Sequence, residues 1–447
     1  MSFYHDFAQP AMIALARAGN RGCLIDTALR DRLVVAEQAK LTQTVAELRE
    51  ILGRELNPNS PKQVKELLYD ELRLPEQRKR AVGGKGKGTV TADEEAIKKL
   101  RRIVPQHAPL LNHLVSYRGS VKRISTLRTT LDVRSDGLSY YVTSYNATGT
   151  ATGRISSSAH LSGKGGNLQN QERGASRRMF TARPGMVFVK ADGSQAEARV
   201  VAALAQDTAW LERFADLGYD VHTENAGFVY SCEQSLVVEE HKIKSPAERV
   251  EWFKTHPQLP LGSPPYVDSM RQRSKPVTHG ANYMGGPQVA VKMADIPFAE
   301  AKVGLQRYLR HRPRLQWWWD KVDEMLHTTR RIKTFWGRQR LFLGRADKST
   351  LRAAVAHEPQ STVGDLINHA FFHLDEELLA VGGYPLLQAH DEIVAEVPKG
   401  QEEPTAALLR HFLEWPMTFP EVGELRIPAD VSVGVNWYDL EKVGAAG

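Results

Sequence analysis

Short runs of apolar and β-branched residues stand far apart in this sequence, and long stretches with helical character lie between them. The runs are Tyr140–Thr143, Met186–Ala191, Pro385–Ala389, Glu392–Val397 and Ala429–Gly434. Their composition is typical of β-strands. The order of helices, strands, helices and strands predicts an α+β fold, in which an antiparallel sheet carries two helical appendages.

Composition narrows the class of protein. The chain has 447 residues, of which 42% are hydrophobic and 25% charged, as is usual for a globular protein of about three domains. No apolar stretch is long enough to predict a membrane span, and the N-terminus lacks the features of a signal peptide. Two cysteines are too few for a disulfide framework, so we expect a cytoplasmic protein without a membrane partner.

Net charge gives a first hint of a partner. Lysine and arginine outnumber the acidic residues by 59 to 52, which gives a net charge of +7, and the pI is near 9.2. A basic protein attracts polyanions, of which nucleic acid is the commonest. A basic surface without a nucleic-acid partner explains the same net charge equally well.

The first 135 residues read as a helical unit. Residues 24–55 have near-helical apolar spacing, and Ser60 and Pro61 are suitable first residues for a helix that extends to Glu71. Thr91 is a candidate cap for a third helix, through Arg102. A glycine- and lysine-rich loop at residues 83–88 separates these helices.

Acidic residues end two of the expected strands. Asp192 follows Met186–Ala191, and Asp391 and Glu392 stand between two apolar runs, as in a tight hairpin. If these strands share a sheet, the carboxylates can meet at its edge and bind Mg²⁺, which prefers oxygen ligands. Turn residues with no chemical role are the alternative reading.

Basic and aromatic residues recur at every fourth position in a later segment. Arg271, Lys275, His279 and Tyr283 would form a stripe along one helix face, which suits the phosphates, sugar and base of a nucleotide. Pro276 should either start or kink this helix. A solvated cationic face is the alternative.

A polar and basic stretch precedes the Asp192 strand. Arg154, Gln169–Gln171, Arg173 and the pair Arg177–Arg178 suit phosphates and minor-groove acceptors, although a solvated loop is equally consistent with them.

Two other patterns favour packing over function. His369 and His373 have a metal-ligand spacing but no suitable acidic neighbour, and Trp317–Trp319 reads as a packing cluster. We expect both groups in or near the core.

Taken in order, these segments resemble the polymerase module of the family A (DNA polymerase I-like) DNA polymerases. The resemblance spans nearly the whole chain. A polymerase module that stands alone in this way resembles the phage-type members of the family. The matching blocks are Thr150–Ser157 with Asn167–Asn170, Asp192–Arg199 (motif A), Asp220–Glu224, Arg271–Tyr283 (motif B), Arg352–Thr362 and His390–Glu392 (motif C), with a thumb-like block at Asn57–Ser60.

The resemblance implies a right-hand fold of palm, fingers and thumb, and addition of deoxynucleotides to a primer 3′-end. It implies that Asp192, Asp391 and the carbonyl of Gly193 hold two Mg²⁺ ions, for which Mn²⁺ may substitute, and that Glu392 supports this site. Lys275 would bind the incoming α-phosphate.

The family pattern also implies residues for recognition. The nucleotide would be bound by Arg271, His222, His279, Tyr283, Glu197 and Gln195, with Glu197 as a steric gate against ribose. DNA contacts would come from Arg154, Gln169, Asn170, Gln360, Arg352, His390, Lys85, Lys87, Lys122 and Arg123.

By this resemblance, residues 1–135 form the thumb, 136–205 and 346–447 the palm, and 206–345 the fingers, with an insertion at 230–266. His279 departs from the family, which usually has an aromatic residue there. We expect primer–template DNA and deoxynucleoside triphosphates as partners, in the cytoplasm of a bacterial or phage-infected cell.

No room is left for an exonuclease domain before the thumb-like helices. If proofreading occurs, we therefore expect a separate partner to supply it, and a helicase or processivity factor is a further candidate partner.

Two other functions fit the pattern less well. A single-subunit RNA polymerase is disfavoured by Glu197, and a non-catalytic DNA-binding homologue is disfavoured by the intact Asp192, Lys275 and Asp391.

Overall fold

The structure is a computed structural model, and it describes residues 3–79, 88–216, 218–259, 268–294, 296–389 and 391–444. The chain forms two compact units. One comprises Ile25–Leu131, and the other comprises Met1–Leu24 together with Asp132–Gly447.

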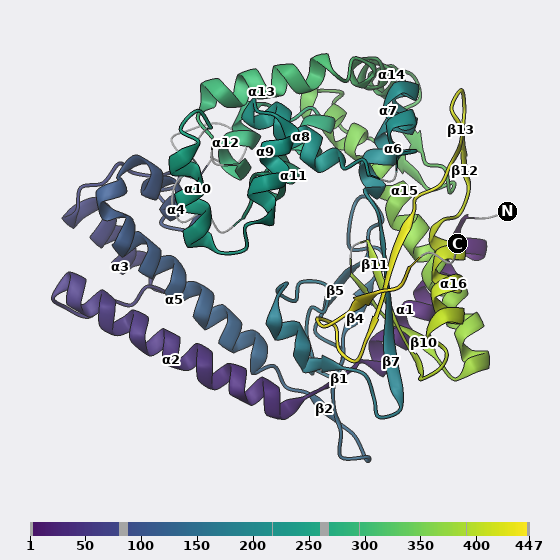
Figure 1. The fold of residues 1–447 in the computed structure, drawn as a ribbon, viewed down its shortest axis with the longest axis horizontal. Helices are drawn as coiled ribbons and strands as arrows, with labels where there is room; N and C mark the ends of the chain where they lie inside the picture. Colours follow the sequence, from purple (N-terminus) through teal and green to yellow (C-terminus); the bar gives the residue numbers. More distant parts are fainter. Residues whose placement is uncertain are drawn as a thin grey trace. The chain divides into compact units, whose positions relative to one another are not determined.

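The unit Ile25–Leu131 is helical, as the sequence predicts. Its helices are α2 (Thr27–Leu52), α3 (Pro61–Lys65), a π-helical turn (Glu66–Glu71), α4 (Glu94–Ile103) and α5 (Ala108–Leu127). The long helices α2 and α5 lie side by side (Figure 1).

The helix starts in this unit follow from their capping residues. Ser60 accepts a hydrogen bond from the Gln63 amide at the start of α3, as expected. The prediction that Thr91 caps the third helix is wrong. Asp93 takes that place, because its carboxylate accepts from the Ala96 amide at 2.9 Å, and Thr91 lies two residues earlier.

A five-stranded antiparallel sheet forms the centre of the larger unit, which confirms the predicted α+β class. Its strands, in spatial order, are β10 (Tyr384–Ala389), β11 (Glu392–Pro398), β7 (Met186–Gly193), β14 (Ala429–Gly434) and β15 (Glu441–Lys442). Four of them coincide with the apolar runs in the sequence. The central position of β7 places its end, at Asp192, between two neighbouring strands.

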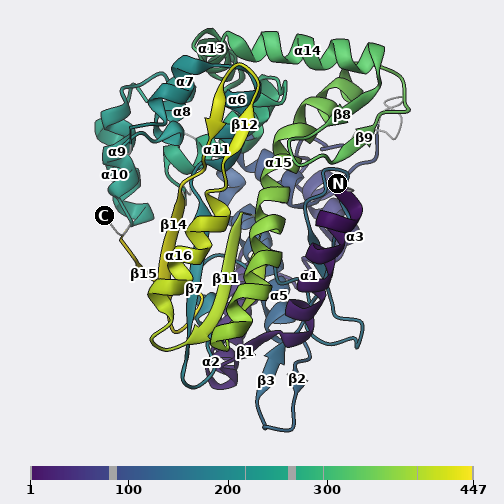
Figure 2. The same ribbon diagram turned by 90° about the vertical axis from the view of Figure 1, so that its right-hand side faces the viewer.

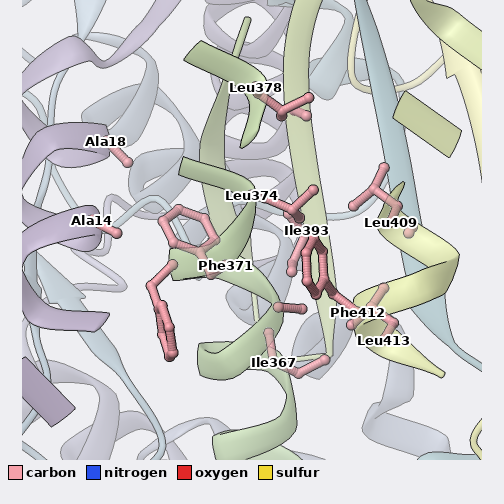
Figure 3. Packing of buried hydrophobic residues seen from close by; sticks show 14 of the residues in the cluster. Ala14, Ala18, Ile367, Phe371, Leu374, Leu378, Ile393, Leu409, Phe412 and Leu413 are labelled. Atoms are coloured by element: carbon pink, nitrogen blue, oxygen red, sulfur yellow. The ribbon is translucent and has the colours of Figure 1, made fainter. Parts of the chain in front are cut away.

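Helices cover one face of this sheet. They are α1 (Gln9–Arg21), α15 (Lys348–Glu377) and α16 (Glu402–Leu413) (Figure 2). Figure 3 shows Phe371 and Leu374 of α15 and Phe412 of α16 packed against Ile393 of β11. Alternate residues of a strand point to opposite faces, so Ala191 faces this core while Asp192 faces away from it.

The segment between β7 and α15 is mainly helical. It contains α6 (Ala196–Leu204), α7 (Thr208–Arg213), α8 (Val221–Tyr230), α9 (Gln234–Lys242), α10 (Pro246–Thr255), α11 (Met270–Asn282), α12 (Pro287–Ala294), α13 (Phe298–Arg310) and α14 (Arg314–Thr328). The predicted insertion at 230–266 contains α9 and α10, and its residues 260–266 lie outside the described residues. Trp318 and Trp319 are buried in α14, as the packing interpretation predicts.

Smaller sheets complete the unit. One has four strands in the order β2 (Asp132–Val133), β3 (Ser139–Tyr141), β1 (Cys23–Ile25) and β6 (Phe180–Thr181). Three more sheets have two strands each. They pair β4 (Ser144–Asn146) with β5 (Ser156–Ser158), β8 (Arg331–Lys333) with β9 (Gln339–Leu341), and β12 (Met417–Phe419) with β13 (Gly423–Leu425). Across the described ranges, we find no helix that combines the length and apolarity needed to span a bilayer.

A buried histidine makes the stability of this core depend on pH. His369 of α15 is only 6% exposed and lies among aromatic rings, including those of Phe7 and Trp415. Burial, followed by the charges of His373 and His411, lowers the pKa of His369 to about 3. An unfolded histidine titrates near about 6.5, so the folded state favours the neutral ring.

We therefore expect stability to be lost as the pH falls from about 6.5 towards 3, by about 1.4 kcal/mol per pH unit from this one group. Denaturant unfolding at pH 7, 6, 5 and 4 measures this slope. H369L should make the slope shallower by that amount, whereas H327L, at an exposed histidine, should leave it unchanged. Equal slopes for H369L and the parent chain would contradict the assignment.

Candidate active site

Strand register brings the two predicted acidic segments together. Glu392, the first residue of β11, is paired with Asp192 near the end of β7. The amide of Gly193 donates a hydrogen bond of 3.2 Å to the carbonyl of Asp391. These acidic residues are far apart in the sequence, but they lie together at the ends of two neighbouring strands of one sheet.

The surroundings of Asp192 disfavour its charged form. Burial, and then the neighbouring charge of Asp391, raises the pKa of Asp192 to about 7. Within the described part of the chain, its Oδ1 is buried and has no hydrogen-bond partner. A divalent cation would satisfy this atom and offset the repulsion between the two carboxylates, so these residues fit the Mg²⁺ that the family resemblance implies.

Glu392 has a different environment from the two aspartates. Its carboxylate accepts a 2.8 Å hydrogen bond from Trp437 Nε1 and lies 3.3 Å from Arg177 and 3.1 Å from Lys190. The Arg177 guanidinium also stacks on the Trp437 ring at 3.8 Å. The two cations thus compensate the charge of Glu392. Among the described residues, no cluster of three His, Cys, Asp or Glu side chains is suited to a metal.

Helix α11 supplies the basic side of the site. Ser269 caps its start and accepts from the Gln272 amide. Pro276 lies inside the helix, so the alternative that Pro276 starts it is wrong. The predicted stripe faces a cavity of about 570 Å³, which also contains the two aspartates.

Most of the predicted site residues line this cavity. They are Asp192, Gly193, Gln195, Glu197, Arg154, His222, Arg271, Lys275, His279, Tyr283, Gln360 and Asp391.

Cations and a neutral histidine occupy the α11 side of the cavity. Burial, and next the charge of Arg271, lowers the pKa of Lys275. Arg271 is held by Asp220, the capping residue of α8, with contacts of 2.5 and 3.0 Å. Burial and then Lys275 lower the pKa of His222 to about 3, so His222 is a neutral hydrogen-bonding group at physiological pH.

Glu197 is the centre of a polar cluster on α6. It accepts hydrogen bonds from Arg154 and from the Tyr283 hydroxyl, and His279 Nδ1 lies 3.4 Å from its Oε1. Burial opposes its ionisation, but contacts with His279, Arg154 and Tyr283 outweigh burial and lower the pKa of Glu197 to about 2. Its charge and position are therefore fixed by three partners.

Gln195 uses its side chain to hold a neighbouring helix. Its Oε1 accepts from the Val221 amide at 2.7 Å, and its Nε2 donates to the Tyr219 carbonyl at 3.1 Å. The residue has a left-handed backbone conformation, with φ of 55°. It lines the cavity and also fixes the first turn of α8.

Other predicted DNA contacts do not belong to the lining of this cavity or fall outside the described residues. Gln169, Asn170 and Arg352 are not among its lining residues. Lys122 and Arg123 belong to α5 in the other unit, where Arg123 pairs with Glu37 at 3.0 Å. Lys85, Lys87 and His390 lie outside the described residues.

The sequence interpretation missed one acidic residue in the cavity. Asp430 of β14 is paired in register with Asp192 of β7 and lines the same cavity. Its side chain is 60% exposed and lies 3.4 Å from Lys442. Only the register of β14 on β7 reveals this neighbour, because Asp430 belongs to no recognised motif.

A cavity in which paired carboxylates face a cationic helix is the class of site that positions and neutralises phosphate groups. Comparison with known proteins is more specific. The sequence model of DNA polymerase family A matches residues 30–245 and 263–439. The chain belongs to DNA polymerase family A.

Individual relatives agree with this assignment. The chain is 29% identical to the thermostable DNA polymerase I of Thermus thermophilus, over 98% of this chain and 48% of the relative. It is 26% identical to DNA polymerase I of Deinococcus radiodurans, over 98% of this chain and 42% of the relative. The chain thus spans about half the length of the curated relatives that it matches.

A solved structure has the same fold. The POL domain of Pol1 from M. smegmatis, in complex with DNA primer-template and dNTP, superimposes with a TM-score of 0.74. The alignment covers 96% of this chain and 70% of that one, at 24% identity. The predicted α+β polymerase fold is therefore confirmed.

Proposed function

We propose that this chain is a template-directed DNA polymerase, which adds deoxynucleotides to a primer 3′-end. The observation that carries the proposal is the cavity that combines Asp192 and Asp391 with Lys275 of α11. Membership of DNA polymerase family A supports the same reaction.

Asp192 and Asp391 would hold the divalent ions, with the Gly193 carbonyl as a further oxygen ligand. Bound Mg²⁺, or Mn²⁺ in its place, supplies charge that favours attack by the primer 3′-oxygen and departure of pyrophosphate. Lys275 binds the phosphate that is attacked, and Arg271 and His222 orient the outer phosphates. Glu392, held by Arg177 and Trp437, keeps the β7–β11 edge in place.

Glu197 selects the sugar. Arg154, Tyr283 and His279 hold its carboxylate in one position, so it forms a fixed barrier where a ribose 2′-hydroxyl would lie. Arg154 and Gln360, on the cavity wall, would contact the minor groove of the new base pair. This arrangement favours a DNA polymerase over an RNA polymerase.

Primer extension tests the proposal. With a labelled primer–template and Mg²⁺, the chain should extend the primer with dNTPs and much less with rNTPs, and EDTA should stop the reaction. Efficient primer-free RNA synthesis would favour the RNA polymerase alternative. Tight DNA binding without extension would favour the non-catalytic alternative.

His279 offers a specific prediction about nucleotide affinity. H279F removes the contact with Glu197 but leaves Arg154 and Tyr283 to hold that carboxylate, and it provides a larger apolar ring. Aromatic stacking contributes about 0.5–1.5 kcal/mol, so the Kd for dNTP should fall by roughly 2- to 12-fold, and the use of dideoxynucleotides should change. Pre-steady-state titration measures both, with H279A as the comparison, which should weaken binding. Unchanged constants for H279F would remove any stacking role.

The wider assignments rest on the family pattern. We propose that residues 1–135 act as the thumb together with its N-terminal lead-in, 136–205 and 346–447 as the palm and 206–345 as the fingers. We also propose that primer–template DNA is contacted by Gln169, Asn170, Arg352, Lys122 and Arg123. We also propose that the chain works in the cytoplasm of a bacterial or phage-infected cell. A separate exonuclease, helicase or processivity partner stays a prediction.

A further inference from the structure

The start of helix α11 is fixed by two consecutive residues of α9. Glu240 Oε2 accepts a 2.8 Å hydrogen bond from the amide of Met270, the first residue of α11. His241 Nδ1 lies 2.8 Å from the hydroxyl of Ser269, which caps the same helix. The first amides of a helix have no partner within the helix, so these contacts define where α11 begins.

The Glu240 carboxylate needs a cation because it is fully buried. An isolated buried carboxylate is strongly destabilising. Arg249 of α10 provides the opposite charge, with Nε 2.5 Å from Glu240 Oε1 and a side chain that is only 5% exposed. The Arg249 guanidinium also donates to the carbonyl of Ile243, where α9 ends.

Helix α10 lies in a part of the chain that the family's sequence model leaves unmatched, residues 246–262. It nevertheless contributes to the same hydrophobic core as α11. Phe253 of α10 is completely buried in a cluster with Val237 of α9 and with Met270 and Val277 of α11. The unmatched segment and the helix that lines the cavity therefore share one core.

We propose that Arg249 is a positioning residue for nucleotide binding, which acts through Glu240 to fix the start of α11. This inference rests on the proposed function, because α11 carries Arg271, Lys275 and His279 into the cavity. Lys275 lies five residues beyond Met270, about 7.5 Å along the helix. A small shift or fraying of the first turn therefore displaces the phosphate-binding groups, and misplacement by about 1 Å can cost a factor of 10².

Removal of Arg249 should loosen the start of α11 in a defined way. In R249M, Glu240 loses its ion-pair partner and keeps the weaker compensation that the charge of Arg273 provides. The buried carboxylate is then less stable in its ionised form, so it takes up a proton or leaves its position. Either change weakens the hydrogen bond to the Met270 amide. In the double variant R249M/E240Q both charges of this ion pair are removed, and the glutamine oxygen still accepts from that amide.

Single-nucleotide incorporation and hydrogen exchange test the inference on the full chain. R249M should raise the Kd for dNTP about tenfold and change the affinity for primer–template DNA less than twofold, and residues 268–275 should exchange their amides faster. R249M/E240Q should restore the Kd to within about threefold of the parent value, since it removes the buried carboxylate that has lost its ion-pair partner. K254M, at an exposed lysine of the same helix, should match the parent chain.

A dNTP Kd for R249M within twofold of the parent value would overturn the inference, as would a double variant that binds dNTP as poorly as R249M. A fall in Tm alone, with unchanged Kd and exchange, would mean that Arg249 is merely structural. If R249M does not fold, R249K replaces it, because lysine keeps the charge but loses the second donor. R249K should have a dNTP Kd between those expected for the parent chain and for R249M. A dNTP Kd equal to that of the parent chain would contradict the inference.

The proposed function can fail separately. If the parent chain extends no primer, the polymerase assignment is wrong, whereas the exchange rates of residues 268–275 in R249M still decide whether Arg249 holds the start of α11.

Discussion

D192N should slow primer extension by roughly 10³-fold while it leaves the fold intact. Asparagine has the shape of aspartate but carries no charge, so the buried oxygen that lacks a partner would no longer attract a divalent ion. About 4 kcal/mol of lost transition-state stabilisation corresponds to a rate loss of roughly 10³-fold. Single-turnover extension of a labelled primer at saturating dNTP measures this loss.

Asp430 provides a matched comparison for this variant. It lies beside Asp192 in the neighbouring strand and lines the same cavity, but it is 60% exposed and paired with Lys442. D430N should therefore slow extension by less than tenfold. Equal losses in D192N and D430N would mean that the general negative charge of the cavity matters, and not the particular place of Asp192.

K275M should produce the second largest loss. Burial and the charge of Arg271 lower the pKa of Lys275, which indicates a desolvated ammonium that gains from contact with phosphate. Loss of one preorganised donor to a developing charge costs about 10²–10³ in rate. We expect a loss of this size in kcat/KM for dNTP, with DNA affinity nearly unchanged.

K302M is the control for this variant, because Lys302 is exposed on α13, and it should retain parent-like constants. A K275M enzyme within threefold of the parent chain would show that Lys275 has no role in nucleotide binding or transfer.

Local patterns predicted the individual strands well. Met186–Ala191 and Glu392–Val397 have the composition of strands, and both are strands in the structure. The same patterns did not predict how the strands pair, because register depends on contacts between distant segments. The resemblance to a family supplied the expectation that Asp192 and Asp391 meet; spacing alone did not.

The same limit explains what was missed. Asp430 lies beside Asp192 only because β14 pairs with β7. The environment of Glu392 depends on the cations Arg177 and Lys190 and on the donor Trp437, which is far from both in the sequence. Neither arrangement leaves a local signal, whereas the cap at Asp93 does: an aspartate directly before Glu94 is a common helix start.

For Glu197 and Gln195, the family pattern implied a contact with the nucleotide but not the contacts that each side chain makes within the protein. The pattern implied that both residues contact the nucleotide. The structure gives Glu197 three partners that fix its charge, and it gives Gln195 a second task, to hold the first turn of α8. Such shared use of a side chain becomes visible only when the backbone around it is known.

Manganese binding tests the central claim most directly, because Mn²⁺ can replace Mg²⁺ and is observed by electron paramagnetic resonance. The chain should be titrated with Mn²⁺ in the presence of a dideoxy-terminated primer–template and the matching dNTP. The account predicts tight Mn²⁺ binding by the parent chain and its loss in D192N and D391N, with D430N close to the parent chain. If D192N and D391N bind Mn²⁺ as tightly as the parent chain, the two aspartates do not hold the metal.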